Sequence, residues 1–277
     1  MIDSSDGRQI LALAKQATSL AGELIRSRAP HTLTLKGDRD LTSDVDTAVE
    51  QLVRDFLRQH TPNLGFLGEE GGGADPVDGS RWILDPIDGT INFLHGLPLC
   101  AVSLSLMCND ITLIGVIDMP FLGGQYYALS NHGSYADGQR LQVSTTQTLN
   151  AALVSVDQYT FGVGAERNNR ARHQLVEYLA SRAQRVRMLG ASAVDLAWTA
   201  QGRLDACIIL GNKPWDTSAG VLIAREAGAR ILDLHGANHT ANSSATIAVG
   251  PSLERELMAV IRAAFANTAT ANGIEHA

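Results

Sequence analysis

The stretch WILDPIDGTINF, residues 82–93, decides how the chain around it folds. It opens with a large apolar run that is typical of a buried strand. The run stops at Asp85, and Pro86 has no N–H group to offer a neighbouring strand, so we expect the strand to end near Pro86. The Asp-Gly pair at 88–89 predicts a turn. Thr90 then begins a segment that could form a helix, and its residue type suits the N-cap.

This order of residues predicts a metal-dependent phosphate site. Asp85 and Asp88 lie at the end of the strand, and carboxylate oxygens are preferred ligands of hard cations. The helix start beside them offers free backbone N–H groups, which hold phosphate. An aspartate-rich turn that merely leads out of a strand is the alternative, and two aspartates alone would favour it. The complete stretch is far more specific than its two aspartates.

The stretch resembles a signature of the inositol monophosphatase family, in which an aromatic residue and aliphatic residues precede D-P-I-D-G-T and N-F. The segment 214–228, with its Pro-Trp-Asp, Ser-Ala-Gly and Glu-Ala-Gly triplets, resembles the second signature of the same family. Residues 67–70 match the G-E-E motif of the family. Residues 40–46 match its D-x-V-T-x-x-D motif, with threonine and serine replacing the commoner valine and threonine.

The match at 187–193 is only partial, because Ala191 replaces a hydroxyl residue. Each matching acid also has an ordinary structural role when it is taken alone. Ser43 and Asp46 suit an N-cap and a first-turn acid, and Asp216 suits the first turn of another helix. The glutamates at 69–70 could be solvated loop charges. Two independent signatures in the expected order favour the family, and the resemblance runs from about residue 7 to 265.

The resemblance implies a Mg2+-dependent, Li+-sensitive phosphomonoesterase and assigns roles to particular residues. Two or three Mg2+ ions would be held by four carboxylates and one backbone carbonyl, namely Glu70, Asp85, Ile87, Asp88 and Asp216. The attacking water would be oriented by Glu70, Thr90 and Asp46. The substrate would be bound by Asp88, Gly89, Thr90, Gly190, Ala191, Ser192 and Asp216. Like charges ~4 Å apart repel by roughly 4 kcal/mol at an effective dielectric constant near 20, so these carboxylates need cations to share a pocket.

The sequence indicates the substrate less closely than it indicates the type of reaction. Related enzymes hold sugar hydroxyls with a glutamate from the strand before the second signature, and Ile209 at that position cannot accept a hydrogen bond. Ile91 differs from the lysine often seen in histidinol-phosphatase members, which leans toward polyol phosphates. We expect hydrolysis of inositol monophosphate, or a similar small polyol phosphate, to the polyol and phosphate. Histidinol phosphate, fructose 1,6-bisphosphate and adenosine 3',5'-bisphosphate are alternatives. A macromolecule-binding regulatory protein that retains the fold is the alternative of another class.

Composition narrows the class of protein. The chain has 277 residues, 45% of them apolar and 18% charged, as expected of a soluble globular protein with a large core. Its net charge of -7 gives no global basic field for nucleic acid or an anionic membrane. Three cysteines without a CxxC spacing fit a reducing cytoplasm. We see no signal peptide at 1–6 and no run long enough to span a bilayer. The family resemblance implies a homodimer.

Apolar periodicity predicts two halves. The first, 1–148, should contain helices at 6–28 and from Ser43, loops at 36–40 and 71–73, and a meander of antiparallel strands. The second, 149–277, should alternate strands and helices. We expect its strands at 152–156, 186–189, 204–210, 230–233 and 245–249. We expect its helices at 166–182, 192–201, 216–227 and 251–265. The halves together should form one α/β (α+β) layered sandwich, and the resemblance implies alternating α-β-α-β-α layers.

Two further groups of residues are expected to have structural roles. The arginines between 167 and 187 form a local basic cluster. A solvated helix face or a subunit contact accounts for this cluster better than nucleic acid does, because no aromatic residues are interleaved. His235 and His239 have helical ligand spacing, but Gly236 and Asn238 predict a loop, so we expect no zinc pair.

Overall fold

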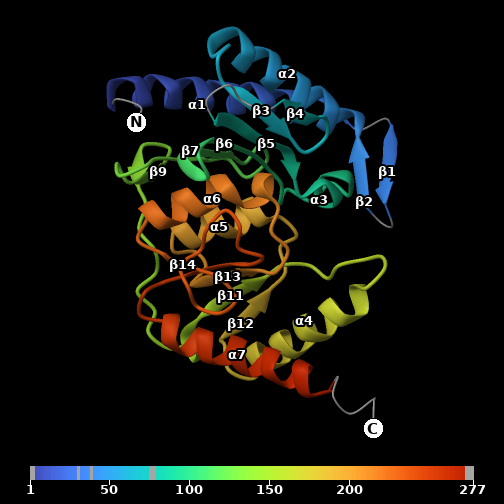
Figure 1. The fold of residues 1–277 in the computed structure, drawn as a ribbon, viewed down its shortest axis with the longest axis vertical. Helices are drawn as coiled ribbons and strands as arrows, with labels where there is room; N and C mark the ends of the chain where they lie inside the picture. Colours follow the sequence, from blue (N-terminus) through green and yellow to red (C-terminus); the bar gives the residue numbers. More distant parts are fainter. Residues whose placement is uncertain (1–3, 30–31, 38–39, 75–78, 272–277) are drawn as a thin grey trace.

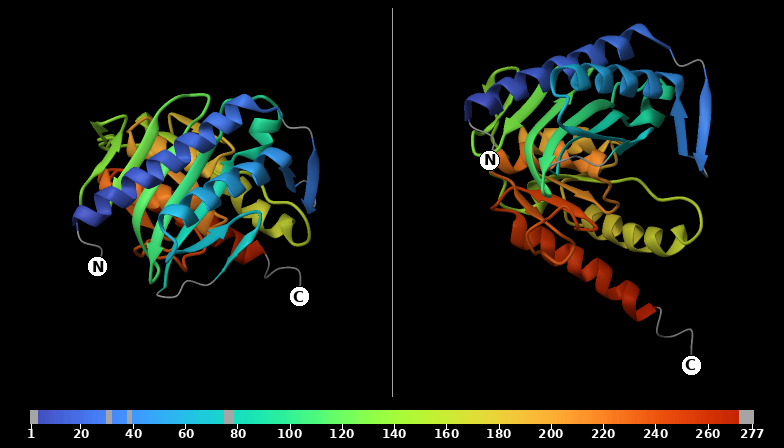
Figure 2. Two further views of the ribbon diagram at one scale, coloured as in Figure 1. Left: turned by 90° about the horizontal axis from the view of Figure 1, so that it is seen from above. Right: turned by 45° about the horizontal axis from the view of Figure 1, so that its top comes forward.

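The computed structural model describes residues 4–29, 32–37, 40–74 and 79–271. Helices and sheets alternate in α-β-α-β-α layers, as the resemblance implied (Figure 1). Two long helices cover one face of a large sheet, a second pair of helices separates this sheet from a smaller one, and a third pair covers the far side (Figure 2). The layered fold is confirmed, whereas the division of the chain at residue 148 stays a prediction.

The outermost layer consists of α1, Ser4–Ser27, and α2, Asp44–His60. Each helix carries an apolar stripe, so that one face is buried on the large sheet while the other meets water. Ser43 caps α2 as predicted: its hydroxyl accepts from the Asp46 N–H, and the Asp46 carboxylate accepts from the Ser43 N–H. This capping box fixes the backbone at the start of α2 and with it the position of Asp46.

The large sheet has eight strands in the order β10-β9-β8-β7-β6-β5-β3-β4. From β5 to β10 each strand pairs antiparallel with the next, which confirms the predicted meander. β3 runs parallel to β5, so the two strands end at the same edge of the sheet. The strands are β3 Gly65–Gly68, β4 Gly72–Ala74, β5 Ser80–Asp88, β6 Ala101–Cys108, β7 Ile111–Asp118, β8 Gln125–Leu129, β9 Ser134–Ala136 and β10 Gln139–Arg140.

The strand of the first signature, β5, is longer than predicted. β5 passes through Pro86 and ends at Asp88. Its pairing with β3 stops at Leu84, and its pairing with β6 is irregular between Asp85 and Asp88. The missing N–H of Pro86 therefore produces an irregularity within the strand rather than its end. The irregular segment carries the two aspartates of the predicted site.

Two predicted loops contain short strands. β1, Leu33–Gly37, and β2, Asp40–Ser43, form a two-stranded sheet, so part of the expected 36–40 loop is extended; 38–39 lie outside the described residues. β4 pairs with β3 although it was expected to be a glycine loop. Backbone pairing decides both cases, and a polar or glycine-rich sequence does not reveal such pairing.

The small sheet is mixed, with the order β12-β11-β13-β15-β14. β11 is parallel to β12 and β13, and β15 is antiparallel to β13 and β14. The strands are β11 Leu153–Val156, β12 Arg185–Arg187, β13 Ala206–Ile209, β14 Arg230–Leu232 and β15 Thr246–Val249. The helices of this half are α4 Ala165–Ala180, α5 Ser192–Ala200, α6 Pro214–Glu226 and α7 Glu254–Ala271, with a short 3-10 turn at Leu149–Ala151. α7 begins after Pro251, not at it.

Small residues let α6 lie close to both of its neighbours. A Cβ atom at Gly115 of β7 would lie 2.7 Å from the Ala219 carbonyl oxygen. A Cβ atom at Gly220 of α6 would lie 2.5 Å from Cβ of Leu196 in α5. These close approaches fix the helix that carries Asp216 in its first turn. Within the described ranges, no helix combines the length and apolar character needed to cross a bilayer.

Candidate active site

A pocket of about 330 Å³ lies where β5 ends, facing the starts of α5 and α6. The first signature contributes one side of its lining, and Asp216 of the second signature contributes another. The predicted site residues that line it are Asp85, Ile87, Asp88, Gly89, Thr90, Gly190, Ala191, Ser192 and Asp216. The tertiary structure thus brings together segments that are more than a hundred residues apart in the chain.

The two β5 aspartates are buried among other acids. Asp85 is 2% exposed and Asp88 is 7% exposed. Burial raises the pKa of Asp85 well above its ordinary value, and repulsion from Glu69, Asp88 and Asp216 raises it further. Burial and repulsion from Asp216 likewise raise the pKa of Asp88. Burial and mutual repulsion make the charged form of these acids unfavourable, and bound cations would offset both effects. The acids are therefore a suitable set of cation ligands.

The start of α5 binds Asp88. The carboxylate of Asp88 accepts from the Ser192 N–H at 3.1 Å and from the Ala193 N–H at 2.7 Å. These bonds hold the carboxylate in place and oppose the rise in its pKa. Gly190 precedes this turn with a φ of 78°, and a side chain there would collide with the Gln158 amide. The partly matching 187–193 motif therefore contributes first of all to positioning Asp88.

Thr90 does not cap the short helix α3, Thr90–Leu94, as was expected. The N-cap is Gly89, whose φ of 85° is unfavourable for other residues. A side chain at Gly89 would also approach the Leu99 carbonyl oxygen to 2.8 Å. The Thr90 hydroxyl lies 3.2 Å from Asp46 Oδ1 and 2.9 Å from the Ile87 carbonyl oxygen, and both can accept its proton. The hydrogen bond between Thr90 and Asp46 that the resemblance implied is present.

The two signatures are linked through Ser103 of β6. Ser103 pairs with Asp85 in the sheet. Its hydroxyl donates to the Trp215 carbonyl oxygen at 3.1 Å. The first turn of α6, which carries Asp216, is thereby tied to the strand beside Asp85.

The glutamate pair after β3 differs from the expectation. Glu69 lines the pocket and raises the pKa of Asp85, whereas Glu70 is not among the lining residues. Glu50 of α2 anchors this turn, since its carboxylate accepts from the N–H groups of Glu70 and Gly71 at 2.9 Å each. The geometry therefore favours Glu69, one residue earlier than the position that the resemblance supplied.

The carboxylates line the pocket but do not converge on a single position. In the described part of the chain, no three His, Cys, Asp or Glu side chains form a group that could hold a metal ion as they stand. The chemistry of the donor set nevertheless fits a hard cation, because Glu69, Asp85, Asp88 and Asp216 all offer carboxylate oxygens to one pocket.

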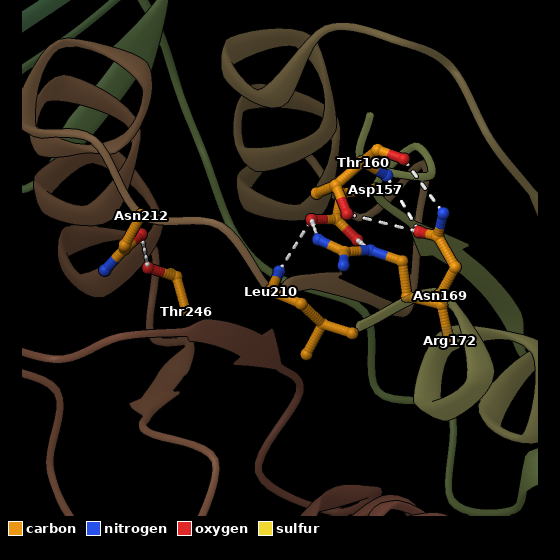
Figure 3. Close-up of polar contacts among 7 residues, drawn as sticks. All are labelled: Asp157, Thr160, Asn169, Arg172, Leu210, Asn212 and Thr246. Carbon is orange, nitrogen blue, oxygen red and sulfur yellow. Dashed lines mark hydrogen bonds and ion pairs between the residues drawn. The ribbon is translucent and has the colours of Figure 1, made fainter. Parts of the chain in front are cut away.

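The far wall of the pocket, which includes Asp157 and Arg172, was not predicted from the sequence. Arg172 belongs to the arginine cluster that was expected to form a solvated helix face or a subunit contact. It is instead 3% exposed and binds both carboxylate oxygens of Asp157, at 3.1 and 2.9 Å (Figure 3). Asp157 also accepts from the Leu210 N–H at 2.8 Å. The available signal was the position of Asp157 directly after β11, since strand ends carry ligand contacts in open α/β sheets. Ile209 lies in the core at 1% exposure and does not line the pocket.

Known proteins are similar to this chain in sequence and in fold. The model of the inositol monophosphatase family matches residues 6–268. Inositol monophosphatase 1 of Solanum lycopersicum is 32% identical over 264 residues, which cover 92% of this chain and 95% of the relative. The fructose-1,6-bisphosphatase/inositol-1-monophosphatase of Thermotoga maritima is 31% identical, over 81% of this chain and 84% of the relative. The crystal structure of the extragenic suppressor protein suhB from Bartonella henselae superimposes with a TM-score of 0.86 at 28% identity, over 92% and 98% of the two chains. The chain therefore belongs to the inositol monophosphatase family.

Proposed function

We propose that this protein hydrolyses a small phosphate monoester, most of all inositol monophosphate, with the help of Mg2+. Its family membership places it among the phosphoric monoester hydrolases. One observation carries the proposal: carboxylates from three separate segments, at Glu69, at 85–88 and at Asp216, line one pocket beside a short helix start. Such a set suits a cation-assisted reaction of an anionic substrate.

Two or three Mg2+ ions would be held by Glu69, Asp85, Asp88, Asp216 and the carbonyl of Ile87. When bound, the metal supplies a polarised phosphate oxygen, a more acidic water and a stabilised leaving group. The resemblance implied Glu70 as a metal ligand. We assign this role to Glu69 instead, because Glu69 lines the pocket and raises the pKa of Asp85.

The remaining roles belong to the protein's own groups. The N–H groups of Gly89 and Thr90 would hold the phosphate at the start of α3. The Thr90 hydroxyl, positioned by Asp46, would orient the attacking water together with Glu69. Ser192 and Gly190 would shape the pocket beside Asp88, whose carboxylate they help to position.

The identity of the alcohol is the finer part of the proposal. Inositol monophosphate is supported by the names of the relatives, and the Thermotoga maritima relative makes fructose 1,6-bisphosphate the second candidate. Histidinol phosphate and adenosine 3',5'-bisphosphate have less support. Ile209 lies in the core and does not line the pocket, so we assign hydroxyl recognition to the far wall, where Asp157 and Arg172 line it. A purely macromolecule-binding role would leave the acid-lined pocket without a use.

Phosphate release across a panel of monoesters, with Mg2+ and with chelator, tests the proposal. We expect turnover of inositol monophosphate that needs Mg2+ and is suppressed by Li+, because a monovalent ion cannot stabilise the leaving group equally. Full activity in chelator would reject the metal mechanism. Release from none of the panel members with Mg2+ present would reject the phosphatase itself.

We further propose a cytoplasmic homodimer. The support is the family membership and the three free thiols, Cys100, Cys108 and Cys207. Light scattering after size-exclusion chromatography measures the dimer directly, and a monomeric mass would contradict it.

A further inference from the structure

A second cavity, of about 730 Å³, lies on the other side of the start of α6. The tip of the β6–β7 hairpin forms one wall, and α6 with the segment 238–242 forms the other. Its volume is within the range of about 300–1,000 Å³ that small-molecule sites occupy. None of the carboxylates of the active site lines it.

The charge of this cavity is opposite to that of the whole chain. Its lining contains the cationic side chains of Arg81, Lys213, Arg225 and Arg230 against one carboxylate, that of Asp110. The chain as a whole has 22 basic and 29 acidic residues. A local excess of cations in an acidic protein creates a positive potential that attracts anions to this face.

Three of these cations form no ion pair with a carboxylate of the described residues. Arg230 is paired with Glu254 at 3.1 Å. Within the part of the chain that the structure describes, Arg81, Lys213 and Arg225 have no carboxylate at ion-pair distance. Partial burial lowers the pKa of Arg225, although the charge of the adjacent Glu226 opposes this shift. Cations that face one cavity repel each other, and a bound anion would relieve this repulsion.

A network of polar side chains holds the wall that carries Arg225. The side chain of Asn212 donates to the Ser243 carbonyl oxygen at 2.7 Å. It also accepts from the Thr246 hydroxyl at 2.7 Å (Figure 3). His239 lies 3.0 Å from the Asn212 amide, and its carbonyl accepts from Arg225 at 3.5 Å. Burial lowers the pKa of His239 to about 4, so that this ring is neutral near pH 7 and works as a structural partner.

The cavity also has an apolar part and a connection to the active site. Its apolar lining includes Met107, Ile111, Val221 and Ile231, which could contact a ring. Lys213 lines both this cavity and the acidic pocket, and it directly precedes the turn that carries Asp216.

We propose that this basic cavity is a second binding site, for an organic phosphate with the charge and size of a nucleoside diphosphate. Arg81, Lys213 and Arg225 would bind the phosphate groups, and the apolar lining would contact the ring. The inference does not depend on which monoester the active site hydrolyses.

ADP in the presence of a chelator is a suitable probe, measured by isothermal titration calorimetry. Without divalent cations the acidic active-site pocket repels the phosphates, so that saturable binding reports the basic cavity. We expect binding to the wild type that weakens about tenfold or more in Arg225→Gln, since a charge-assisted contact is lost. Arg81→Gln should weaken it similarly and gives a second variant if Arg225→Gln does not fold.

Two control variants distinguish binding in the basic cavity from binding in the active site or at surface arginines. Asp85→Asn alters the active site and should keep ADP binding. Arg182→Gln removes an arginine that follows α4 and does not line the cavity, so this variant should also keep ADP binding. Pyrophosphate should bind more weakly than ADP. Absence of saturable binding to the wild type, equal binding by Arg225→Gln and Arg81→Gln, loss of binding in Asp85→Asn, or equal affinity for pyrophosphate would overturn the proposal.

Discussion

Among individual residues, the adjacent glutamates of the turn after β3 have different surroundings. Glu69 lines the pocket and acts on Asp85, while Glu70 follows it outside the lining. The Glu50 carboxylate fixes this turn and is itself held by Arg54 at 2.6 Å. One peptide unit therefore decides which carboxylate belongs to the acidic cluster.

Glu69→Gln and Glu70→Gln form a matched pair, because each removes one charge from the same turn. We expect Glu69→Gln to lower kcat by about 100-fold or more, since a ligand and water-orienting group is lost. Glu70→Gln should keep turnover within a few-fold of wild type. Phosphate release at saturating Mg2+ measures both. The reverse order of the two variants would return the role to Glu70.

At the scale of elements, the position of α6 depends on two glycines that allow close packing. Gly115 of β7 lies against Ala219, and Gly220 of α6 lies against Leu196 of α5. A Cβ at Gly220 would lie 2.6 Å from Cδ1 of Leu196, so that α5 and α6 cannot both keep their places if one is added. This packing holds the turn with Asp216 beside β5 and β6.

Gly220→Ala tests this packing through the sign of its effect. Alanine in a helix interior is favoured over glycine by about 1 kcal/mol, so an unpacked site would be stabilised. We expect a loss of about 1–3 kcal/mol instead, because the added methyl overpacks the contact with Leu196. In the background of Leu196→Gly, which removes the whole opposing side chain including the Cβ atom at 2.5 Å, the same change should be neutral or stabilising. Chemical denaturation of the four proteins measures the coupling.

The contact between α1 and β7 contains a carboxyl with a perturbed pKa. Burial raises the pKa of Asp118 from 3.8 to about 6, although Arg26 and Gln125 oppose the rise. The folded state then holds this proton at a pH where the unfolded chain has released it. The contribution of Asp118 to the free energy of unfolding is therefore largest below about pH 4 and decreases as pH rises through about 6.

Asp118→Asn should remove this pH dependence. We expect the variant to melt higher than wild type above about pH 6, where the buried carboxylate is charged, and close to wild type near pH 4. Thermal melts across this range, in chelator so that metal binding does not contribute, measure the difference. A variant that melts lower than wild type at neutral pH would show that the pairing with Arg26 outweighs burial.

Over the whole molecule, the candidate metal ligands belong to different layers. Asp85 and Asp88 come from the large sheet, and Asp216 comes from the helix layer behind it. Bound Mg2+ would link these layers, whereas the metal-free carboxylates repel each other. Metal content should therefore be visible in global stability.

Asp216→Asn separates repulsion from metal binding. Asp216 lies in the first turn of α6 but is not its N-cap, which is Lys213, so the fold should survive. Without metal, we expect the variant to melt at or above wild type because one repulsive charge is gone. Mg2+ at a hundredfold its dissociation constant should stabilise wild type by roughly 2.7 kcal/mol. The variant should gain less and lose nearly all turnover. Equal stabilisation with intact turnover would remove Asp216 from the metal site.

The sequence by itself determined the family, the layered fold and most of the pocket. Apolar periodicity and the two signatures are local in the chain, and local patterns predict strands, helices and motif residues such as Asp85, Asp88 and Asp216. The capping box at Ser43 and Asp46 was likewise predictable, because its hydrogen bonds join residues three apart.

The tertiary structure decided what depends on contacts between distant segments. It continued β5 through Pro86, because pairing with β6 resumes beyond the irregularity. It placed Glu69 rather than Glu70 at the pocket through the anchor from Glu50. It also buried Arg172 against Asp157. In the sequence nothing distinguishes Arg172 from the other arginines between 167 and 187. Burial and partner choice arise from packing between layers, and no periodicity within one segment encodes them.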